Sequence, residues 1–234
     1  MGRVIMSGIV PTLKAPALYQ ANFADNDWAK IIDACHKNRV PDTWLVGNSK
    51  IMLIDGTEYQ IDIIGKGHDD YADGSGKAPL TFQLNDCYAD VNRMNSSNTN
   101  SGGWTSCAMR QTHLPAILAL MPTEVQNGIR EVNKLTSAGS QSSTINTTAD
   151  KLFLLSEIEI FGSVSYSKSG EGTQYDYYKA GNSKVKNRNG GAAYWNERSP
   201  LKDGSTQFCM VSNTGTADYG GASSAAGVAF GFCF

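Results

Sequence analysis

The segment His68-Asp69-Asp70 holds the densest group of acidic side chains, with Asp73 close behind it. Carboxylates spaced this closely in a loop could bind a calcium ion, which prefers oxygen ligands. Compared with an EF-hand loop, however, Tyr71 stands at a ligand position and Leu80 stands where the closing glutamate belongs. We therefore expect no metal and no cofactor, and a cation near Asp69, Asp70 and Asp73 stays open. The alternative is that Asp69 or Asp70 fixes the loop by accepting backbone N–H bonds.

Paired carboxylates that could cleave a glycosidic bond are Glu157 with Glu159, and Glu171 with Asp176. The first pair falls on a short expected helix and the second in a loop rich in Gly and Ser. A general acid needs a pKa that burial beside its partner has raised, and nothing in the sequence marks either pair as sharing a cleft. We predict that the chain is not an enzyme. A cell-wall polysaccharide-degrading enzyme is kept as an alternative.

The cysteines give no support to nucleophilic or metal chemistry. Cys107 and His113 are six residues apart on an expected helix, so their side chains point in different directions. No C-x-x-C pair occurs, which disfavours zinc ribbons and thioredoxin-like chemistry. We expect buried free thiols, and a pairing of Cys209 with Cys233 on neighbouring candidate strands stays open. The full set is Cys35, Cys87, Cys107, Cys209 and Cys233.

Composition limits the classes of function. The chain has 234 residues, of which 41% are hydrophobic and 18% are charged, enough for the core of one large domain. A net charge of −2 gives no electrostatic footprint for nucleic acid. The sequence contains neither a signal peptide nor a run of apolar residues that could insert into a membrane. We expect assembly in a host cytoplasm and a final location in the virion, with a bacterial surface as the alternative.

Local patterns predict an α+β fold. Residues 1–24 contain Pro11 and Pro16 and are expected to form an N-terminal arm or attachment segment, followed by a recognition domain over residues 25–234. Asp55-Gly56 lies between two apolar runs and predicts a β-hairpin. Ser156 and Glu159 have the spacing of a capping box. Helices are expected over residues 25–36, 105–113, 115–121 and 122–130, and strands over 50–54, 58–64, 80–84, 152–155, 192–195, 207–212, 216–219 and 227–234.

The chain ends on the apolar segment Gly227-Val228-Ala229-Phe230-Gly231-Phe232-Cys233-Phe234. Free termini normally fray in water, so a terminus this apolar must be paired and buried. We expect an antiparallel sheet that joins the N-terminal and C-terminal strands. Loops held on such a scaffold commonly form binding surfaces.

The loops before this last strand have the composition of an adaptable binding surface. Tyr219 lies in Thr216-Ala217-Asp218-Tyr219-Gly220-Gly221, where little else is apolar. Tyrosine surrounded by Ser, Gly, Asn and Asp is typical of antibody paratopes. The residues expected to contact a ligand lie in three loops and are Asn196, Glu197, Asn213, Thr214, Asp218, Tyr219, Ser223 and Ser224.

An ordered series of short motifs resembles a family of uncharacterised domains found in phages, prophages and surface proteins of gut Gram-positive bacteria. The resemblance covers about residues 44–234, and its members are taken to be tail-fibre or adhesin-like components. The motifs are Gly65-Lys66-Gly67-His68-Asp69-Asp70, Leu80-Thr81-Phe82, the segment from Met94 to Trp104, Met109-Arg110, Asp150 to Glu157, Gly170 to Tyr175, Arg198-Ser199-Pro200 and the closing apolar segment.

The resemblance implies a C-type-lectin-like domain of the type shared by formylglycine-generating enzymes and the variable proteins of diversity-generating retroelements. The chain departs from this pattern in two places. Asn196-Glu197 inserts an extra residue before Arg198, and Gly227-Val228-Ala229 lacks the arginine found in many lectin-like relatives. The closely spaced cysteine pair of the oxidising enzymes is also missing, which disfavours that activity.

These observations together predict a phage virion or surface-associated receptor-binding protein that recognises a protein or glycan of the host surface through its C-terminal loops. The same loops could be diversified by a retroelement. The resemblance to tail fibres implies a homotrimer that joins other virion proteins through the N-terminal arm, without nucleic acid or membrane insertion. A structural virion component (tail tip, baseplate or capsid decoration) is the alternative from another class.

Overall fold

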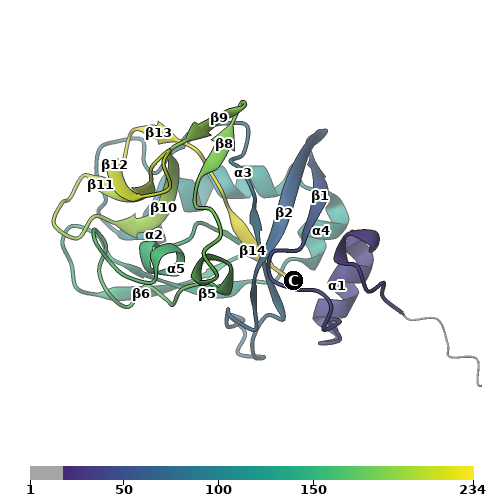
Figure 1. The fold of residues 1–234 in the computed structure, drawn as a ribbon. Coiled ribbons are helices and arrows are strands. Elements are labelled where there is room, and N and C mark those ends of the chain that lie inside the picture. The colour runs from purple at the N-terminus through teal and green to yellow at the C-terminus, as the bar shows by residue number, and fades with distance from the viewer. Residues whose placement is uncertain (1–17) are drawn as a thin grey trace, which may run out of the picture.

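The computed structural model describes residues 18–234 and has a mixed α+β architecture with mostly antiparallel sheets. Its largest sheet has the order β1-β2-β3-β14-β7, so the last strand lies between β3 and β7. Figure 1 shows the yellow β14 among the blue strands of the N-terminal half. The predicted sheet that joins the two ends of the chain is confirmed. Its strands are β1 (Ser49–Ile54), β2 (Thr57–Lys66), β3 (Leu80–Leu84), β7 (Leu152–Phe153) and β14 (Gly231–Cys233).

The hairpin of β1 and β2 forms where the sequence predicts it. Asp55 and Gly56 have φ values of 48° and 75°, and a two-residue turn with two positive φ values matches the twist of paired strands. Tyr59, Ile61 and Ile63 alternate with polar residues along β2 and face the core. Asp62, which this alternation would place in solvent, is buried as well and accepts a hydrogen bond from Asn85 at 2.7 Å.

The rest of the chain forms small sheets, which lie mainly on the side of the molecule opposite to β1 and α1 (Figure 1). Three of its strands form a sheet of order β10-β11-β12, with Asn213 and Thr214 in the predicted turn between the last two. The strands are β4 (Asn92–Arg93), β5 (Val132–Ser137), β6 (Ile145–Asp150), β8 (Lys186–Arg188), β9 (Gly191–Ala193), β10 (Trp195–Pro200), β11 (Gln207–Val211), β12 (Ala217–Gly221) and β13 (Ala225–Ala226).

The helices are short, and two have clear local causes. Asp27 caps α1 by accepting the N–H of Lys30 at 2.8 Å, so the helix begins later than the residue 25 expected from the sequence. The predicted capping box of Ser156 and Glu159 is present on α5. The helices are η1 (Phe23–Asp25), α1 (Trp28–His36), α2 (Gly103–Ser106), α3 (Leu114–Leu118), α4 (Thr123–Gly128), α5 (Glu157–Phe161) and α6 (Asp176–Lys179). None of the helices in residues 18–234 combines the length and the apolar run needed to cross a bilayer.

The continuous helix predicted over 105–113 is wrong. It ends at Ser106, and a π-helical turn, η2 (Met109–His113), then leads into α3. Leu114 donates its N–H to Met109, five residues back. Pro115 follows and has no N–H to donate to an α-helical partner, which favours the wider turn at this point.

The predicted boundary of the N-terminal arm at residue 24 also requires correction. Residues 1–17 lie outside the described residues. Tyr19 and Phe23 are buried and pack edge-to-face on Trp44, with ring centroids 6.0 and 5.4 Å away. These residues are therefore part of the domain, because their rings complete its aromatic core.

Replacing Phe232 tests the role of the last strand. Phe232 is fully buried on β14 and stacks on Phe82 at 5.2 Å. Phe232→Ala should lower the free energy of unfolding by about 3–5 kcal/mol through lost burial and a residual cavity. Urea unfolding followed by circular dichroism measures this change. The control is Tyr194→Ala, at an exposed ring, and equal losses in both variants would contradict a buried C-terminal strand.

Candidate functional site

The carboxylates of the acidic loop after β2 pair with cations of the chain itself. Asp69 is buried and contacts Thr81, Lys134 and Tyr175. Asp70 pairs with Lys77 at 2.9 Å and Asp73 pairs with Arg130 at 2.6 Å. The three carboxylates thus pair with three different cations of the chain. Asp69 does fix the loop, but through side-chain donors instead of the backbone donors that we expected.

Asp69 belongs to a buried ion network that also contains Lys134, Glu159 and Arg198. The Lys134 ammonium lies 2.7 Å from Asp69 Oδ1 and 2.8 Å from Glu159 Oε1. Arg198 Nη2 donates to Glu159 Oε1 at 2.8 Å, and Arg198 Nη1 contacts the other oxygen. Burial works against ionisation of Asp69, but the Lys134 ammonium and the hydrogen bonds bring its pKa to about 2. Burial likewise opposes ionisation of Glu159, and Arg198 with Lys134 holds its pKa below the usual value.

Distant segments of the chain meet in this network. Lys134 comes from β5, Glu159 from α5 and Arg198 from β10. Arg198 also donates to the carbonyl oxygens of Leu154 and Glu171, both at 2.9 Å. Each charged group therefore has its partners only when all of these segments are in place.

A polar pocket of about 450 Å³ opens beside the network and is lined by His68, Lys134 and Glu159, among others. His68 stacks on Tyr175 with ring centroids 4.0 Å apart, and burial lowers the pKa of its imidazole. His68, Asp69 and Glu159 each offer a ligand atom within 4.8 Å of the other two. The Lys134 ammonium already binds both carboxylates, so a metal ion would have to displace it. We therefore assign the cluster to an internal ion network.

The other buried carboxylates have structural surroundings too. Glu157 accepts backbone N–H bonds from Ser165, Tyr166 and Ser167 at 2.7–3.1 Å. Glu171 accepts the N–H of Ser137 at 2.7 Å, and burial raises its pKa to about 7. Asp176, the partner that we expected for Glu171, is exposed at the start of α6. The second pair therefore does not share a buried site.

The prediction that Asn196 and Glu197 lie in a contact loop is wrong. Both belong to β10 and are buried, so they cannot touch a ligand on a host surface. Neither carboxylate oxygen of Glu197 has a hydrogen-bond partner among the described residues. Burial raises its pKa well above the usual value, and Glu157 and Glu171 add to the shift. The pairing of β10 with β11 is irregular near the extra residue at Asn196-Glu197. Asn196 pairs with Met210 and Pro200 pairs with Phe208, so four residues along β10 span only two along β11.

The other predicted contact residues occupy the hairpin of β11 and β12 and the turn after it. Asn213, Thr214 and Ser224 are exposed, and Asp218 and Ser223 are partly exposed. Tyr219 is 45% exposed, and its ring lies edge-to-face against Tyr166 with centroids 5.0 Å apart. The five residues of β12 separate the two turns by about 17 Å at the usual rise of a strand. The surface thus has two polar ends with an aromatic pair between them.

The cysteines are free and buried in the described residues, including Cys209 and Cys233. Cys209 lies on β11 and Cys233 on β14, which belong to different sheets. The expectation that these two strands are neighbours is wrong. Burial raises the pKa of the Cys107 thiol to about 12, so this thiol is a poor nucleophile at neutral pH.

Comparison with known proteins places the chain in a family defined by sequence. A model described as a domain of unknown function, DUF6273, matches residues 80–233. The chain belongs to this family. No curated protein matched the chain, and no solved structure did. The DUF6273 domain extends from β3 to β14, so it contains Lys134, Glu159 and Arg198 of the ion network as well as the hairpin with Tyr219.

Sequence reasoning missed the two cations at the centre of the DUF6273 domain. Val132, Lys134 and Thr136 alternate on β5 and are all buried. This period-2 pattern could have shown that Lys134 faces inward with two neighbours of the core face. Arg198 was noticed only within the Arg198-Ser199-Pro200 motif, without a partner.

Removing the guanidinium tests the network. Arg198→Met leaves Glu159 with one buried cation where it had two, and should lower the free energy of unfolding by about 3–5 kcal/mol. The matched control is Lys77→Met, whose pair with Asp70 is exposed and should change stability by less than about 1 kcal/mol. Urea unfolding of both variants measures the difference, and a similar small change in each would show that the network is not satisfied in the folded protein.

Glu171 should make stability depend on pH. Its pKa is about 7 in the folded protein against an ordinary value of 4.5, so the folded state binds the proton more tightly. Its contribution is therefore fully present below pH 4.5 and is lost as the pH rises through 7. Glu171→Gln keeps an acceptor for the Ser137 N–H and never ionises. It should match the wild type at pH 4 and exceed its unfolding free energy by about 3 kcal/mol above pH 7.

Urea titrations between pH 4 and 8 compare this variant with Glu131→Gln, a change at an exposed residue. Parallel curves for wild type and Glu171→Gln would contradict the raised pKa.

Proposed function

We propose that the chain is a non-enzymatic recognition protein of a phage virion or a bacterial surface, with a C-type-lectin-like domain, and that it binds a ligand of the host surface. The observation that carries this proposal is the exposed ring of Tyr219, braced by Tyr166 on a hydrogen-bonded hairpin. A rigid amphipathic ring beside short polar side chains is the usual make-up of an adaptable contact surface.

Several contacts keep the hairpin in one conformation. The Ser212 hydroxyl bonds to Thr214 at 2.9 Å and to Thr216 at 2.8 Å across the turn. The Asp218 carboxylate accepts the N–H of Tyr219 at 2.8 Å. Little ordering entropy is lost when such a preformed surface binds a ligand. The hydrogen bond between the Tyr219 N–H and Asp218 also occupies a backbone donor of β12. Because β12 is an outer strand of its sheet, this disfavours the pairing of a further strand at that edge.

The non-enzymatic part of the proposal rests on the surroundings of the carboxylates. Glu157 accepts three backbone donors, and Glu159 is paired with Arg198 and Lys134. These groups are bound to the chain's own donors, as expected for carboxylates that hold the fold together. The proposed homotrimer follows only from the resemblance to tail fibres. The proposed attachment to other virion proteins involves residues 1–24, of which 1–17 lie outside the described residues.

Binding to host cells tests the proposal. The labelled protein is incubated with a panel of gut Gram-positive bacteria, and bound fluorescence is measured by flow cytometry. Tyr219→Ala should weaken binding at least about tenfold, which corresponds to about 1.4 kcal/mol and is usual for an aromatic hot spot. Tyr219→Phe keeps the ring and should retain most of the binding.

The control variant is Tyr194→Ala, because Tyr194 is 44% exposed and lies outside the hairpin. Thermal unfolding of all variants should show similar melting temperatures. Equal loss in both alanine variants, or absence of binding to any cell of a panel that includes the natural host, would overturn the proposal. Sugar release from purified cell walls would instead favour the enzymatic alternative.

A further inference from the structure

A groove of about 580 Å³ lies next to the turn that holds Ser223 and Ser224. The paired strands β4 and β13 form one side of it, with Arg93 opposite Ala225. The π-helical turn η2 forms the other side through Thr112 and His113. The volume is in the range of small-molecule sites. Ala225 directly follows Ser224 in sequence, so the groove continues the surface proposed for recognition.

The basic side chains in this groove have no partner inside the described protein. Neither Arg93 nor His113 makes a side-chain hydrogen bond or ion pair with any residue of 18–234. Arg93 is exposed and His113 is half-buried, with a pKa lowered by burial. The groove therefore offers a guanidinium with free donors next to an imidazole. A guanidinium fork binds carboxylates and phosphates in two-point geometry.

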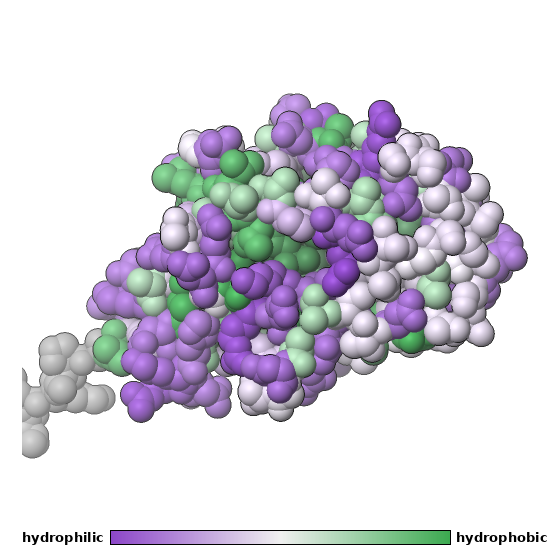
Figure 2. Space-filling view, turned by 180° about the vertical axis from the view of Figure 1, so that it is seen from behind, coloured by the Kyte–Doolittle hydropathy of each residue, from purple (hydrophilic) through white to green (hydrophobic). Residues whose placement is uncertain are grey.

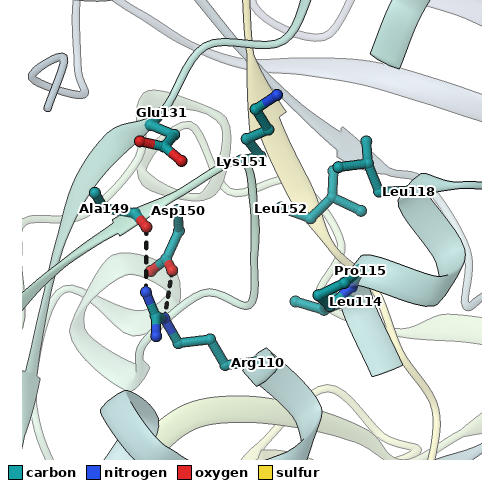
Figure 3. Close-up of a pocket in the computed structure, with 9 residues that line it drawn as sticks. All are labelled: Arg110, Leu114, Pro115, Leu118, Glu131, Ala149, Asp150, Lys151 and Leu152. Atoms are coloured by element: carbon teal, nitrogen blue, oxygen red, sulfur yellow. Dashed lines mark hydrogen bonds and ion pairs between the residues drawn. The ribbon is translucent and has the colours of Figure 1, made fainter. Parts of the chain in front are cut away.

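A second pocket shows the opposite situation and serves as a comparison. It has a volume of about 240 Å³ and contains Arg110 and Asp150 (Figure 3). Arg110 Nε donates to Asp150 Oδ1 at 2.5 Å, and Nη2 donates to the Ala149 carbonyl at 3.2 Å. Its guanidinium is therefore already bound to groups of the chain itself.

Apolar surface also gathers around a hollow on the back of the molecule (Figure 2). Hydropathy alone does not indicate which ligand would bind there.

The rest of the groove combines apolar and hydroxyl-binding groups. Val91 is 38% exposed, and Ala108 and Ala225 add small apolar surfaces. Ser96 and Thr112 supply exposed hydroxyl groups. Pyranose units have apolar C–H faces and hydroxyl groups at their rims, so this lining suits a sugar ring. The free guanidinium adds a preference for a sugar that carries a negative charge.

Hydrogen bonds of backbone N–H groups hold the walls of the groove together. Met109 donates its N–H to Met94 at 3.1 Å, and the Asn95 side chain accepts the N–H of Ala108 at 3.0 Å. Asn95 in turn donates its N–H to Ala222 at 2.8 Å. Hydrogen bonds thus join the loop after β4, the π-helical turn η2 and the turn that holds Ser223 and Ser224. π-Helical turns occur frequently at functional sites.

We propose that this groove binds an anionic sugar unit of a surface glycan, with Arg93 on its carboxylate or phosphate. The ring lies against Val91 and Ala225, and its hydroxyl groups face Ser96, Thr112 and His113. This inference rests on the proposed function, because it names the substrate class of the same surface. A uronic acid and a sugar phosphate share the required chemistry, an anionic group on a sugar ring.

Titration of the full chain followed by NMR tests the assignment. Glucuronate, glucose 6-phosphate and glucose are added separately to the wild type and to Arg93→Met, Arg93→Lys and Arg39→Met. One of the two anions should shift amide resonances of residues 91–96 and 108–113, while glucose should bind at least about tenfold more weakly. Arg93→Met should lower the affinity for the anion at least about tenfold, and Arg93→Lys should restore part of it.

Arg39 is an exposed arginine on another part of the molecule, so Arg39→Met should bind like the wild type. Tighter binding of glucuronate would identify a carboxylated sugar, and tighter binding of glucose 6-phosphate would identify a phosphate-containing glycan. Equal binding of glucose, or full affinity in Arg93→Met, would overturn the inference. Arg93 is exposed, so its replacement should leave the melting temperature nearly unchanged. Thermal unfolding of each variant checks this.

Failure of this inference is distinguishable from failure of the proposed function. If the wild type binds host cells and neither anion binds in the groove, the surface recognises another ligand and only the groove assignment falls. If the wild type binds no cell of a panel that includes the natural host, both the receptor-binding proposal and the groove assignment are rejected.

Discussion

The arrangement of this fold depends on one buried ion network. Two cations, Lys134 and Arg198, face two carboxylates, Asp69 and Glu159, so the charges balance. A buried ion costs several kcal/mol unless it is paired and hydrogen-bonded. An arrangement in which one of the contributing segments moved away would leave a charge without its partner. The network therefore acts mainly to select one arrangement of β5, α5, β10 and the loop after β2, and its net contribution to stability can be modest.

The balance of this network also explains the behaviour of the acids around it. Lys134 and Arg198 pair with Asp69 and Glu159, and the buried Lys186 donates to the carbonyl oxygens of Leu84 and Asn85. Glu197 is left without a hydrogen-bond partner among the described residues, and Glu171 is left with hydrogen-bond donors. Burial then raises the pKa of both groups, to about 7 for Glu171. Removal from water disfavours the charged form of both carboxyl groups, and for Glu197 the neighbouring Glu157 and Glu171 add to the rise in pKa. The pocket next to His68 and Glu159 is thus the open side of a structural core, whereas Arg93, His113 and Tyr219 present polar groups without a side-chain partner among the described residues.

The features that the sequence predicted are those that local chemistry decides. The Asp55-Gly56 hairpin, the capping box at Ser156 and the turn at Asn213 depend on residues a few positions apart, and all three are present. The buried C-terminal strand followed from its apolar composition. Lys134, Arg198 and Glu197 could not be placed in this way, because a charged residue in a strand normally faces solvent. Only partners distant in sequence make its burial favourable, and one sequence does not reveal them.

Packing limits which positions of the proposed recognition surface could vary under a retroelement. A side chain at Gly220 would bring its Cβ within 2.4 Å of Met210 Sδ, and one at Gly221 would reach Asn98 Oδ1 at 2.9 Å. Both atoms lie on flexible side chains, so a larger residue at either position requires Met210 or Asn98 to move. Tyr219 and Ser224 meet solvent and tolerate other side chains. The small residues of this segment therefore have two origins. At 220 and 221 they match the close approach of neighbouring side chains, and diversification of the surface would require least rearrangement at the exposed positions before and after these glycines.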